Sequence, residues 1–234
     1  MENFLFVVEA CVIAVVIVLA AYFTEKLIKR KNDDRERVLS TRKVVVIGVF
    51  SAVSAVLMLF EIPLPFAPAF YKLDFSELPV LVGAFAYGPV AGVMTEFIKI
   101  LLKLVMKGTS TAFVGELANF LVGVSFAFPA SLIYLYKKNK KTAVTGCIAG
   151  TLIMTVFGTL LNAVYLLPTF ADIFGMPLEV IIEMGTKINP RITNVASFVI
   201  WAVAPLNLLK GFLVSLITIF IYKPLSPILK GSNK

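Results

Sequence analysis

The sequence contains no histidine, only two cysteines, and few charged residues, which make up 15% of its 234 positions. The absence of histidine removes the side chain that most often serves as a general base or metal ligand near neutral pH. Cys11 and Cys147 lie in separate apolar runs, so we interpret both as small packing residues. No serine has an evident base for nucleophilic chemistry. We therefore expect neither a metal site nor a resident cofactor, and we do not expect an enzyme.

Apolar residues dominate what remains. They account for 59% of the chain, and the mean hydropathy is +0.93. A soluble domain is typically about 45–50% apolar and about 25% charged. A soluble fold of this size has too little interior to bury so much apolar surface. The composition therefore predicts an all-α membrane protein embedded in the lipid bilayer.

The net charge of +8 is concentrated in short segments between the apolar runs. Eight of the 22 basic residues lie between Lys26 and Lys43, and four more lie between Lys137 and Lys141. Cytoplasmic loops of membrane proteins carry such an excess of lysine and arginine. The charge thus indicates topology in the plasma membrane, and we do not expect nucleic acid as a partner.

Seven apolar segments are predicted to form helices. A spanning helix needs about 20 residues, and the stretch from Leu78 to Met106 is divided into two helices because Gly88 and Pro89 interrupt it. Without this division the Lys137–Lys141 cluster would fall on the outer side. The predicted helices are 4–23, 44–61, 77–90, 89–106, 112–136, 143–167 and 197–222.

These helices define three parts of the chain. Residues 1–25 are predicted to be an N-terminal transmembrane anchor with its N-terminus outside, and residues 26–43 a basic cytoplasmic linker. Residues 44–230 are predicted to form a six-helix substrate-binding membrane domain with a cytoplasmic C-terminus. The loops 62–76 and 168–196 are expected on the external side, and the second of them to contain a short interfacial helix around Leu178–Ile182.

Polar residues at membrane depth are costly, and they usually face a partner or a cavity. Glu96 and Lys99 lie three residues apart in one predicted helix and are expected to pair, while Lys103 and Lys107 continue the same face toward the external end. Further polar positions recur near the outer ends of other helices, and Pro205 is expected to disturb the last helix beside one of them. These positions are Glu116, Asn119, Asn162, Asn207 and Lys210.

Such a set, with the aromatic residues Phe70, Tyr71, Phe75 and Tyr165, suits a planar heteroaromatic ligand with several hydrogen-bonding groups. At this point the sequence resembles a known family. The runs that carry the resemblance are FYKLDFSELP from Phe70, GAFAYGPVAG from Gly83, EFIK from Glu96, GELANF from Gly115 and AVAPLNLLKG from Ala202. Together they are similar to the riboflavin-specific S component, the substrate-binding membrane subunit, of energy-coupling-factor (ECF) transporters.

The resemblance implies a six-helix S-component bundle, here preceded by one extra N-terminal transmembrane helix. It also implies riboflavin or flavin mononucleotide as substrate, captured from outside, and a transmembrane T component with two ATP-binding subunits as partners. ATP would be used by those partners, because this chain contains no Walker A motif. The substrate-binding positions implied are Leu73, Asp74, Phe75, Glu116, Asn119, Asn162, Tyr165, Asn207 and Lys210, with Lys72 beside them in the loop.

Small residues on the second predicted helix, Gly48, Ser51, Ala52 and Ala55, correspond to the family's docking face for the T component. The same residues also suit ordinary packing within the subunit. Alternative functions are an S component for another vitamin, or a self-sufficient ion-coupled secondary transporter of a small heteroaromatic nutrient. The second alternative would need a coupling-ion site, for which the Glu96–Lys99 pair is the candidate.

Overall fold

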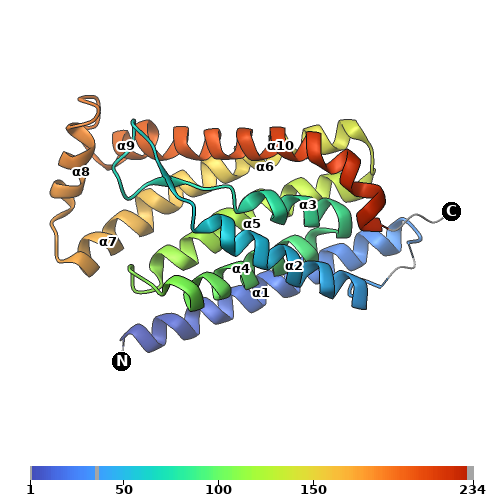
Figure 1. Cartoon of the computed structure of the whole chain (residues 1–234). Helices are drawn as coiled ribbons and strands as arrows, with labels where there is room; N and C mark the ends of the chain where they lie inside the picture. The colour runs from blue at the N-terminus through green and yellow to red at the C-terminus, as the bar shows by residue number, and fades with distance from the viewer. Residues whose placement is uncertain (1, 35–36, 231–234) are drawn as a thin grey trace.

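The computed structural model describes the backbone of residues 2–34 and 37–230, and the side chains of residues 8–34 and 37–222. Its long helices run side by side (Figure 1). The helices and strands are α1 (Glu2–Lys31), α2 (Thr41–Met58), β1 (Ile62–Pro63), β2 (Lys72–Leu73), α3 (Glu77–Tyr87), α4 (Pro89–Lys107), α5 (Val114–Tyr136), α6 (Lys140–Leu161), η1 (Asn162–Leu166), α7 (Leu167–Phe174), α8 (Leu178–Thr186), α9 (Val195–Phe198), η2 (Val199–Val203) and α10 (Ala204–Lys230).

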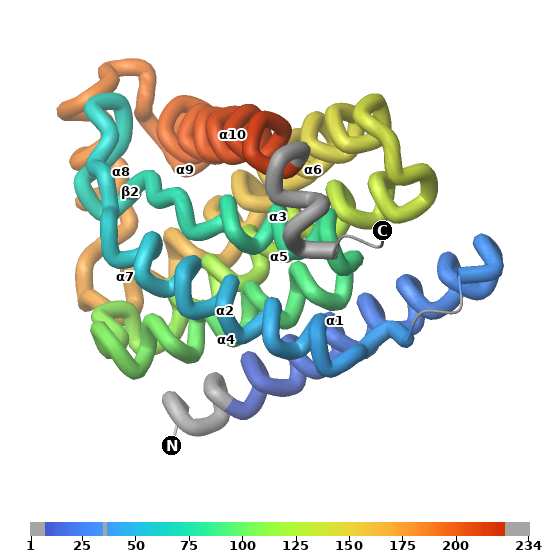
Figure 2. Tube along the Cα trace, turned by 45° about the vertical axis from the view of Figure 1, so that its right-hand side comes forward, coloured from blue at the N-terminus to red at the C-terminus, as the bar shows by residue number. Residues whose placement is uncertain are grey.

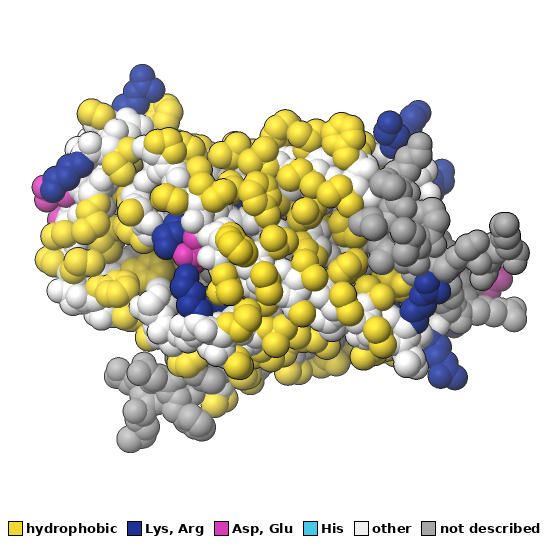
Figure 3. Space-filling view, viewed as in Figure 1, with side chains coloured by type: hydrophobic (Ala, Val, Ile, Leu, Met, Phe, Trp, Pro, Cys, Tyr) yellow, Lys and Arg dark blue, Asp and Glu magenta, His cyan; other side chains and the backbone are white. Residues whose placement is uncertain are grey.

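The chain is an all-α, multi-pass membrane protein, as its composition predicts. Within the described residues, five helices are long and apolar enough to span a membrane, with segments beginning at positions 8, 41, 114, 140 and 195. Helix α4 is 19 residues long but carries four charged side chains, and α3 has 11 residues. On the face drawn in Figure 3, apolar side chains cover the middle and most charged side chains lie toward the two ends. The six-helix bundle with one additional N-terminal helix is confirmed.

The predicted break between α3 and α4 is confirmed at Gly88. Its φ of +97° is in the region that glycine adopts without the steric cost of a side chain. Pro89 then occupies the first position of α4, where its missing N–H leaves no hydrogen bond unmade. The chain reverses at this point within a single residue.

The last two long helices are each interrupted by a π-helical turn. The turn η1 ends two residues before Pro168, and η2 ends two residues before Pro205. A proline cannot donate to the carbonyl four residues earlier, so Val164 and Trp201 each lose that partner and the helix widens locally. The predicted disturbance near Pro205 is confirmed, and an equivalent one precedes Pro168.

The predicted end of the sixth helix at residue 167 is wrong, and the predicted loop 168–196 therefore begins too early. The helix continues without a loop through α7 to Phe174, because the wider η1 turn accommodates the hydrogen bond that Pro168 cannot make. The rest of the segment contains α8 and α9. The short helix predicted around Leu178–Ile182 is the first part of α8.

The connections are sorted between the two ends of the bundle (Figures 1 and 2). The β1–β2 hairpin, the α4–α5 connection and α8 lie at one end. The α1–α2, α3–α4 and α5–α6 connections lie at the other, which carries the dense basic segments. We call these the hairpin end and the basic end. This sorting places the loops predicted to be external at one end and those predicted to be cytoplasmic at the other, and that the hairpin end is external stays a prediction.

Helix α1 packs against α4 and α5 and contributes Ala14 and Ala21 to a shared apolar core. At the basic end, the fully buried Glu25 joins α1 to its neighbours. Its Oε1 lies 2.7 Å from Nζ of Lys43, and its Oε2 accepts a hydrogen bond of 2.8 Å from the backbone N–H of Val90. A Cβ on Gly88 would lie 2.8 Å from this carboxylate. We refer to Glu25, Lys43 and the N-terminus of α4 as the basic-end clamp.

Candidate substrate site

The loop between α2 and α3 folds back over the hairpin end of the bundle and is joined to the η1 turn by Tyr71. Its hydroxyl donates a 2.6 Å hydrogen bond to Oδ1 of Asn162, and Nδ2 of Asn162 donates to the carbonyl of Gly158 at 2.8 Å. The Tyr71 ring also lies 6.0 Å from that of Phe198, centroid to centroid. Burial raises the pKa of the Tyr71 hydroxyl well above its usual range. The hydroxyl is therefore a hydrogen-bond donor at any physiological pH.

The same loop is joined to α10 through Asp74. One carboxylate oxygen accepts a hydrogen bond from the backbone N–H of Ser76 at 2.8 Å, which fixes the turn before α3. The other lies 3.1 Å from Nζ of Lys210. Lys210 also lies 3.2 Å from Oε1 of Glu77, the first residue of α3. All three charged side chains are buried, so their pairing is not weakened by water.

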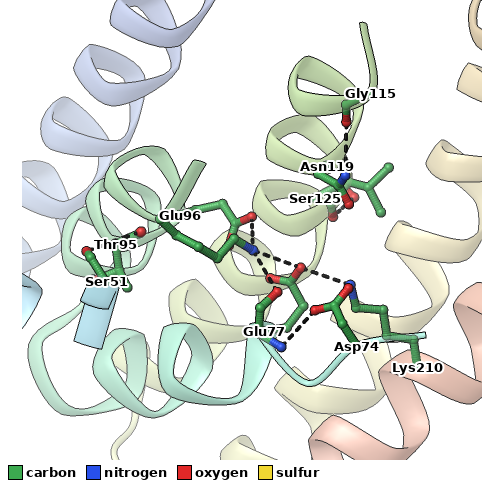
Figure 4. Close-up of polar contacts among 12 residues, drawn as sticks. Ser51, Asp74, Glu77, Thr95, Glu96, Gly115, Asn119, Ser125 and Lys210 are labelled. Carbon is green, nitrogen blue, oxygen red and sulfur yellow. Dashed lines mark hydrogen bonds and ion pairs between the residues drawn. The ribbon is translucent and has the colours of Figure 1, made fainter. Parts of the chain in front are cut away.

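Glu77 links this contact to a second buried ion pair deeper in the bundle (Figure 4). Nζ of Lys99 lies 3.1 Å from Oε1 of Glu77 and 2.5 Å from Oε1 of Glu96, and it donates to Oγ of Ser76 at 3.2 Å. The predicted pairing of Glu96 with Lys99 is confirmed. The charge network thus consists of three carboxylates and two ammonium groups, contributed by Asp74, Glu77, Glu96, Lys99 and Lys210.

The amides of Asn162 and Asn207 both lie beside Gly158. A Cβ on Gly158 would lie 2.7 Å from Nδ2 of Asn207, so the glycine leaves room for this side chain. Lys210 follows Asn207 after nearly one helical turn on the same helix. The structure therefore brings Asn162, Asn207 and Lys210 to one region, where the η1 and η2 turns also meet.

Two further ionic groups lie at the hairpin end. Glu116 pairs with Lys103 at 2.5 Å and accepts hydrogen bonds from the hydroxyls of Thr109 and Thr111. Glu61 lies on the loop, 2.8 Å from Nζ of Lys72 and 3.0 Å from Nζ of Lys107.

Lys72 and Lys107 favour the charged form of the Glu61 carboxylate. Partial burial would raise the pKa of its carboxyl, but Lys72 and Lys107 outweigh that effect and lower it. Glu61 therefore adds an exposed ionic contact between the loop and the end of α4.

The predicted substrate-binding residues fall into distinct environments. Leu73 is a buried residue of the loop, and Phe75 packs against the core formed by α3, α5, α6 and α10. Glu116 lies in the separate group described above, and Asn119 donates within its own helix to the carbonyl of Gly115. Tyr165 is exposed on the η1 turn. That these residues contact a substrate stays a prediction.

The sequence did not predict the contacts that two residues of this region make. Tyr71 was considered only as an aromatic surface, although its hydroxyl bonds Asn162. Glu77 was not singled out, although it bridges Lys99 and Lys210. The signal for Glu77 was present, because an acidic residue at the start of a short apolar helix needs a buried cationic partner.

The predicted docking face on α2 is divided by the fold. Ser51 and Ala55 are fully buried, and Oγ of Ser51 donates to the carbonyl of Ile47 at 2.7 Å and to that of Thr95 at 3.3 Å. Packing against α4 therefore occupies both side chains. Gly48 and Ala52 lie on the exposed face of α2, so the prediction is kept for these two residues.

Among the described residues, no group of three or more cysteine, aspartate or glutamate side chains is arranged to hold a metal ion. The site offers amides, hydroxyls, aromatic rings and paired charges. This arrangement can bind and enclose a polar planar molecule through hydrogen bonds and ring contacts.

Comparison with known proteins agrees with this architecture. A family model for the substrate-specific component of ECF transporters matches residues 42–222. The riboflavin transporter RibU of Staphylococcus aureus is 33% identical over 189 residues, which cover 81% of this chain and 93% of that protein. The riboflavin transporter FmnP of Bacillus subtilis is 28% identical, with coverages of 81% and 94%.

A solved structure, "Structure and mechanism of the S component of a bacterial ECF transporter", is 33% identical to this chain. It superposes with a TM-score of 0.62, over 81% of this chain and 98% of that chain. The family match begins after α1, so the additional helix lies outside the matched region.

Proposed function

This chain belongs to the family of substrate-specific components of ECF transporters, and we propose that its substrate is riboflavin or a closely related flavin such as flavin mononucleotide. The relatives named as riboflavin transporters support this choice, because they align over about four-fifths of the chain. The proposal makes the protein a carrier subunit and not an enzyme. It is expected in the plasma membrane, with the hairpin end outside and the basic end in the cytoplasm.

The observation that carries the proposal is the pair of contacts between the loop and the last two helices. Tyr71 meets Asn162 beside the η1 turn, and Asp74 meets Lys210 beyond the η2 turn. Opening the loop would free the amide oxygen of Asn162 and remove one of the two carboxylates that contact Lys210, in the region where Asn207 also lies. π-Helical turns occur frequently at functional sites, since they redirect side chains from the regular helical positions.

In this mechanism the flavin enters when the loop opens, and its ring system lies among the loop aromatics while Asn162, Asn207 and Lys210 bond its polar edge or side chain. Closure then excludes water, which strengthens the polar contacts. Delivery into the cell requires a T component and two ATP-binding subunits. Gly48 and Ala52 on α2 are proposed as the docking surface for the T component, because small residues four apart let helices approach closely.

Binding can be tested by titrating flavin fluorescence on the purified chain in detergent. Asn162→Ala and Lys210→Ala are each expected to weaken flavin binding by about tenfold or more, since a hydrogen bond to a charged or buried group contributes about 1.5–3 kcal/mol. Lys187→Ala, an exposed change at the same end of the molecule, serves as the control. Wild-type affinity in both site variants would remove the site assignment.

Transport can be tested separately. Ala52→Leu should leave flavin binding unchanged but reduce uptake in cells that contain the partner subunits, because the larger side chain obstructs close helix approach. Val164→Leu, which alters an exposed position away from α2, is the matched control. Uptake by the chain alone in vesicles, driven by a sodium or proton gradient, would instead favour a secondary transporter.

A further inference from the structure

A polar hollow of about 300 Å³ lies at the basic end, between the end of α1 and the end of α5. Its walls are formed by the polar residues Lys29, Asn32, Asp34, Tyr136 and Lys138 and by the apolar residues Ile28 and Leu135. The hollow is separate from the charge network, which involves α3, α4 and α10. Neither the flavin site nor the proposed docking surface on α2 uses these residues.

The position of the hollow corresponds to the level of lipid headgroups. One wall is formed where the spanning segment Val8–Lys31 ends, and the other where Val114–Tyr136 ends. The ends of spanning helices lie at the boundary between hydrocarbon and water. A molecule in the hollow would therefore have its polar part at this boundary and its apolar part along the helices.

The charge around the hollow favours an anion. Lys29 is largely buried and its charge is balanced by the lining carboxylate of Asp34 at 3.6 Å, so the net positive charge of the lining comes from Lys138, which is exposed at the opposite wall. Nζ of Lys31 lies 5.4 Å from the centre of the Tyr136 ring, which adds a further cation at the rim. Asn32 supplies an uncharged amide. These donors match the oxygens of a phosphodiester.

We propose that this hollow binds the headgroup of an anionic phospholipid, with phosphatidylglycerol as the simplest example. The lysines and Asn32 contact the phosphodiester, while the apolar wall contacts the glycerol and the first acyl carbons. Basic pockets between transmembrane helices on the cytoplasmic side are a recurring means of lipid recognition. Because one wall comes from α1, the bound lipid links the additional helix to the six-helix bundle.

The test uses the purified full chain in detergent at about 150 mM salt, where long-range attraction is screened. Retention of added phosphatidylglycerol is measured by native mass spectrometry, and the thermal midpoint is measured in parallel. The variants are Lys29→Gln/Lys138→Gln and Lys138→Gln alone. The matched control is Lys140→Gln/Lys141→Gln, which removes the same charge at the same end but outside the hollow.

Wild-type protein should retain phosphatidylglycerol in preference to phosphatidylcholine and be stabilised by it. The double variant should bind phosphatidylglycerol about tenfold or more weakly, because two charge-assisted contacts are lost, and the control should change by less than about threefold. Lys138→Gln alone should give an intermediate loss, and it keeps the test valid if replacing the buried Lys29 impairs folding.

Three results would overturn the proposal. The first is equal retention of the two lipids by wild-type protein, and the second is an equal loss in the control and the hollow variants, which would indicate general charge attraction. The third is full stabilisation by inorganic phosphate alone, which would make the site one for a free anion. Flavin affinity is read in every variant, so failure here is distinguishable from failure of the flavin assignment.

Discussion

At the basic end of the bundle, Glu25 faces Lys43 and the N-terminus of α4, whereas the charge network toward the hairpin end sets two lysines among three carboxylates. The groups of the basic-end clamp all belong to helices or to helix termini. In the charge network, Asp74 lies on the loop that covers the site. The basic-end clamp is therefore fixed by the packing of helices, whereas the charge network loses the contact with Asp74 when the loop moves.

This difference separates stability from binding. Removing a member of the basic-end clamp should affect folding and leave flavin affinity intact. Within the charge network, Lys99 is held between two helical carboxylates, but the Lys210–Asp74 contact depends on loop closure. Replacing Lys99 should therefore lower the stability of the fold, whereas removing the Lys210–Asp74 contact should weaken flavin binding.

The largest effect is expected for Lys99→Met. The variant leaves Glu77 and Glu96 buried without their shared cation, and breaking a buried ion pair in this way costs about 3–5 kcal/mol. Thermal unfolding in detergent measures the change. Lys72→Met, which removes a surface ion pair of the loop, should cost less than about 1 kcal/mol. Equal midpoints for the two variants would contradict the structural role of Lys99.

A smaller loss of stability is expected for Glu25→Gln. The change removes the charge that faces Lys43 but keeps an acceptor for the N–H of Val90. We expect a loss of about 2–3 kcal/mol, below the full value for a buried pair, because Lys43 is buried here but lies in the first turn of α2 and can turn toward water once the charge of Glu25 is removed.

Flavin affinity should stay within about twofold of wild type in Glu25→Gln, since RT ln 2 is well below any lost site contact. Lys26→Gln, an exposed neighbour on α1, is the control for stability. A marked loss of flavin binding in Glu25→Gln alone would show that the two ends are coupled. It would contradict the expectation that the basic-end clamp affects stability and not flavin affinity.

Asp74→Asn should have the opposite signature. Asparagine keeps an acceptor for the N–H of Ser76, and Glu77 remains beside Lys210, so unfolding should change by less than about 1 kcal/mol. The charged contact that holds the loop closed is lost, and flavin dissociation should accelerate by about tenfold. Stopped-flow fluorescence measures this rate. A large drop in thermal midpoint with unchanged dissociation would assign Asp74 to the fold instead.

The smallest effect is expected for Glu61→Gln, because this ion pair is exposed to solvent. The lowered pKa of Glu61 gives a stabilising contribution that is complete above the ordinary glutamate value of about 4.3 and disappears as the pH falls through the lowered value. Wild type and variant should therefore differ slightly at neutral pH and converge in acid. A difference that persists at low pH would exclude this charge effect.

The spacing of apolar and basic residues was sufficient to predict most of the helices. The break at Gly88 followed from local backbone chemistry together with the need to place Lys137–Lys141 on the basic end. The end of the sixth helix was misjudged because the prediction ends the helix with its apolar segment at residue 167, whereas the π-turn accommodates Pro168 and the helix continues to Phe174. The first helix extends beyond the apolar run to Lys31, because the buried contacts of Glu25 stabilise the helix past that run.

For the candidate site, sequence spacing predicted contacts within a helix better than contacts between distant segments. Glu96 and Lys99 are three apart, so their pairing follows from helical geometry. Tyr71 and Asn162 are separated by 91 positions, and Lys210 and Asp74 by 136. Those pairings depend on how the loop folds over the bundle, which no local preference specifies. The hairpin that positions Tyr71 has only two residues in each strand, too short to leave a periodic pattern.

The place of α1 has a consequence for how the subunit can be approached within the plane of the membrane. It occupies the flank made by α4 and α5, whereas α2 presents Val45, Val49 and Val56 outward beside Gly48 and Ala52. The side of the subunit formed by α4 and α5 is thus covered by α1, whereas the side formed by α2 is exposed. A protein that binds the exposed face of α2 and a molecule that binds beside α1 would contact different surfaces. Both could therefore bind at the same time.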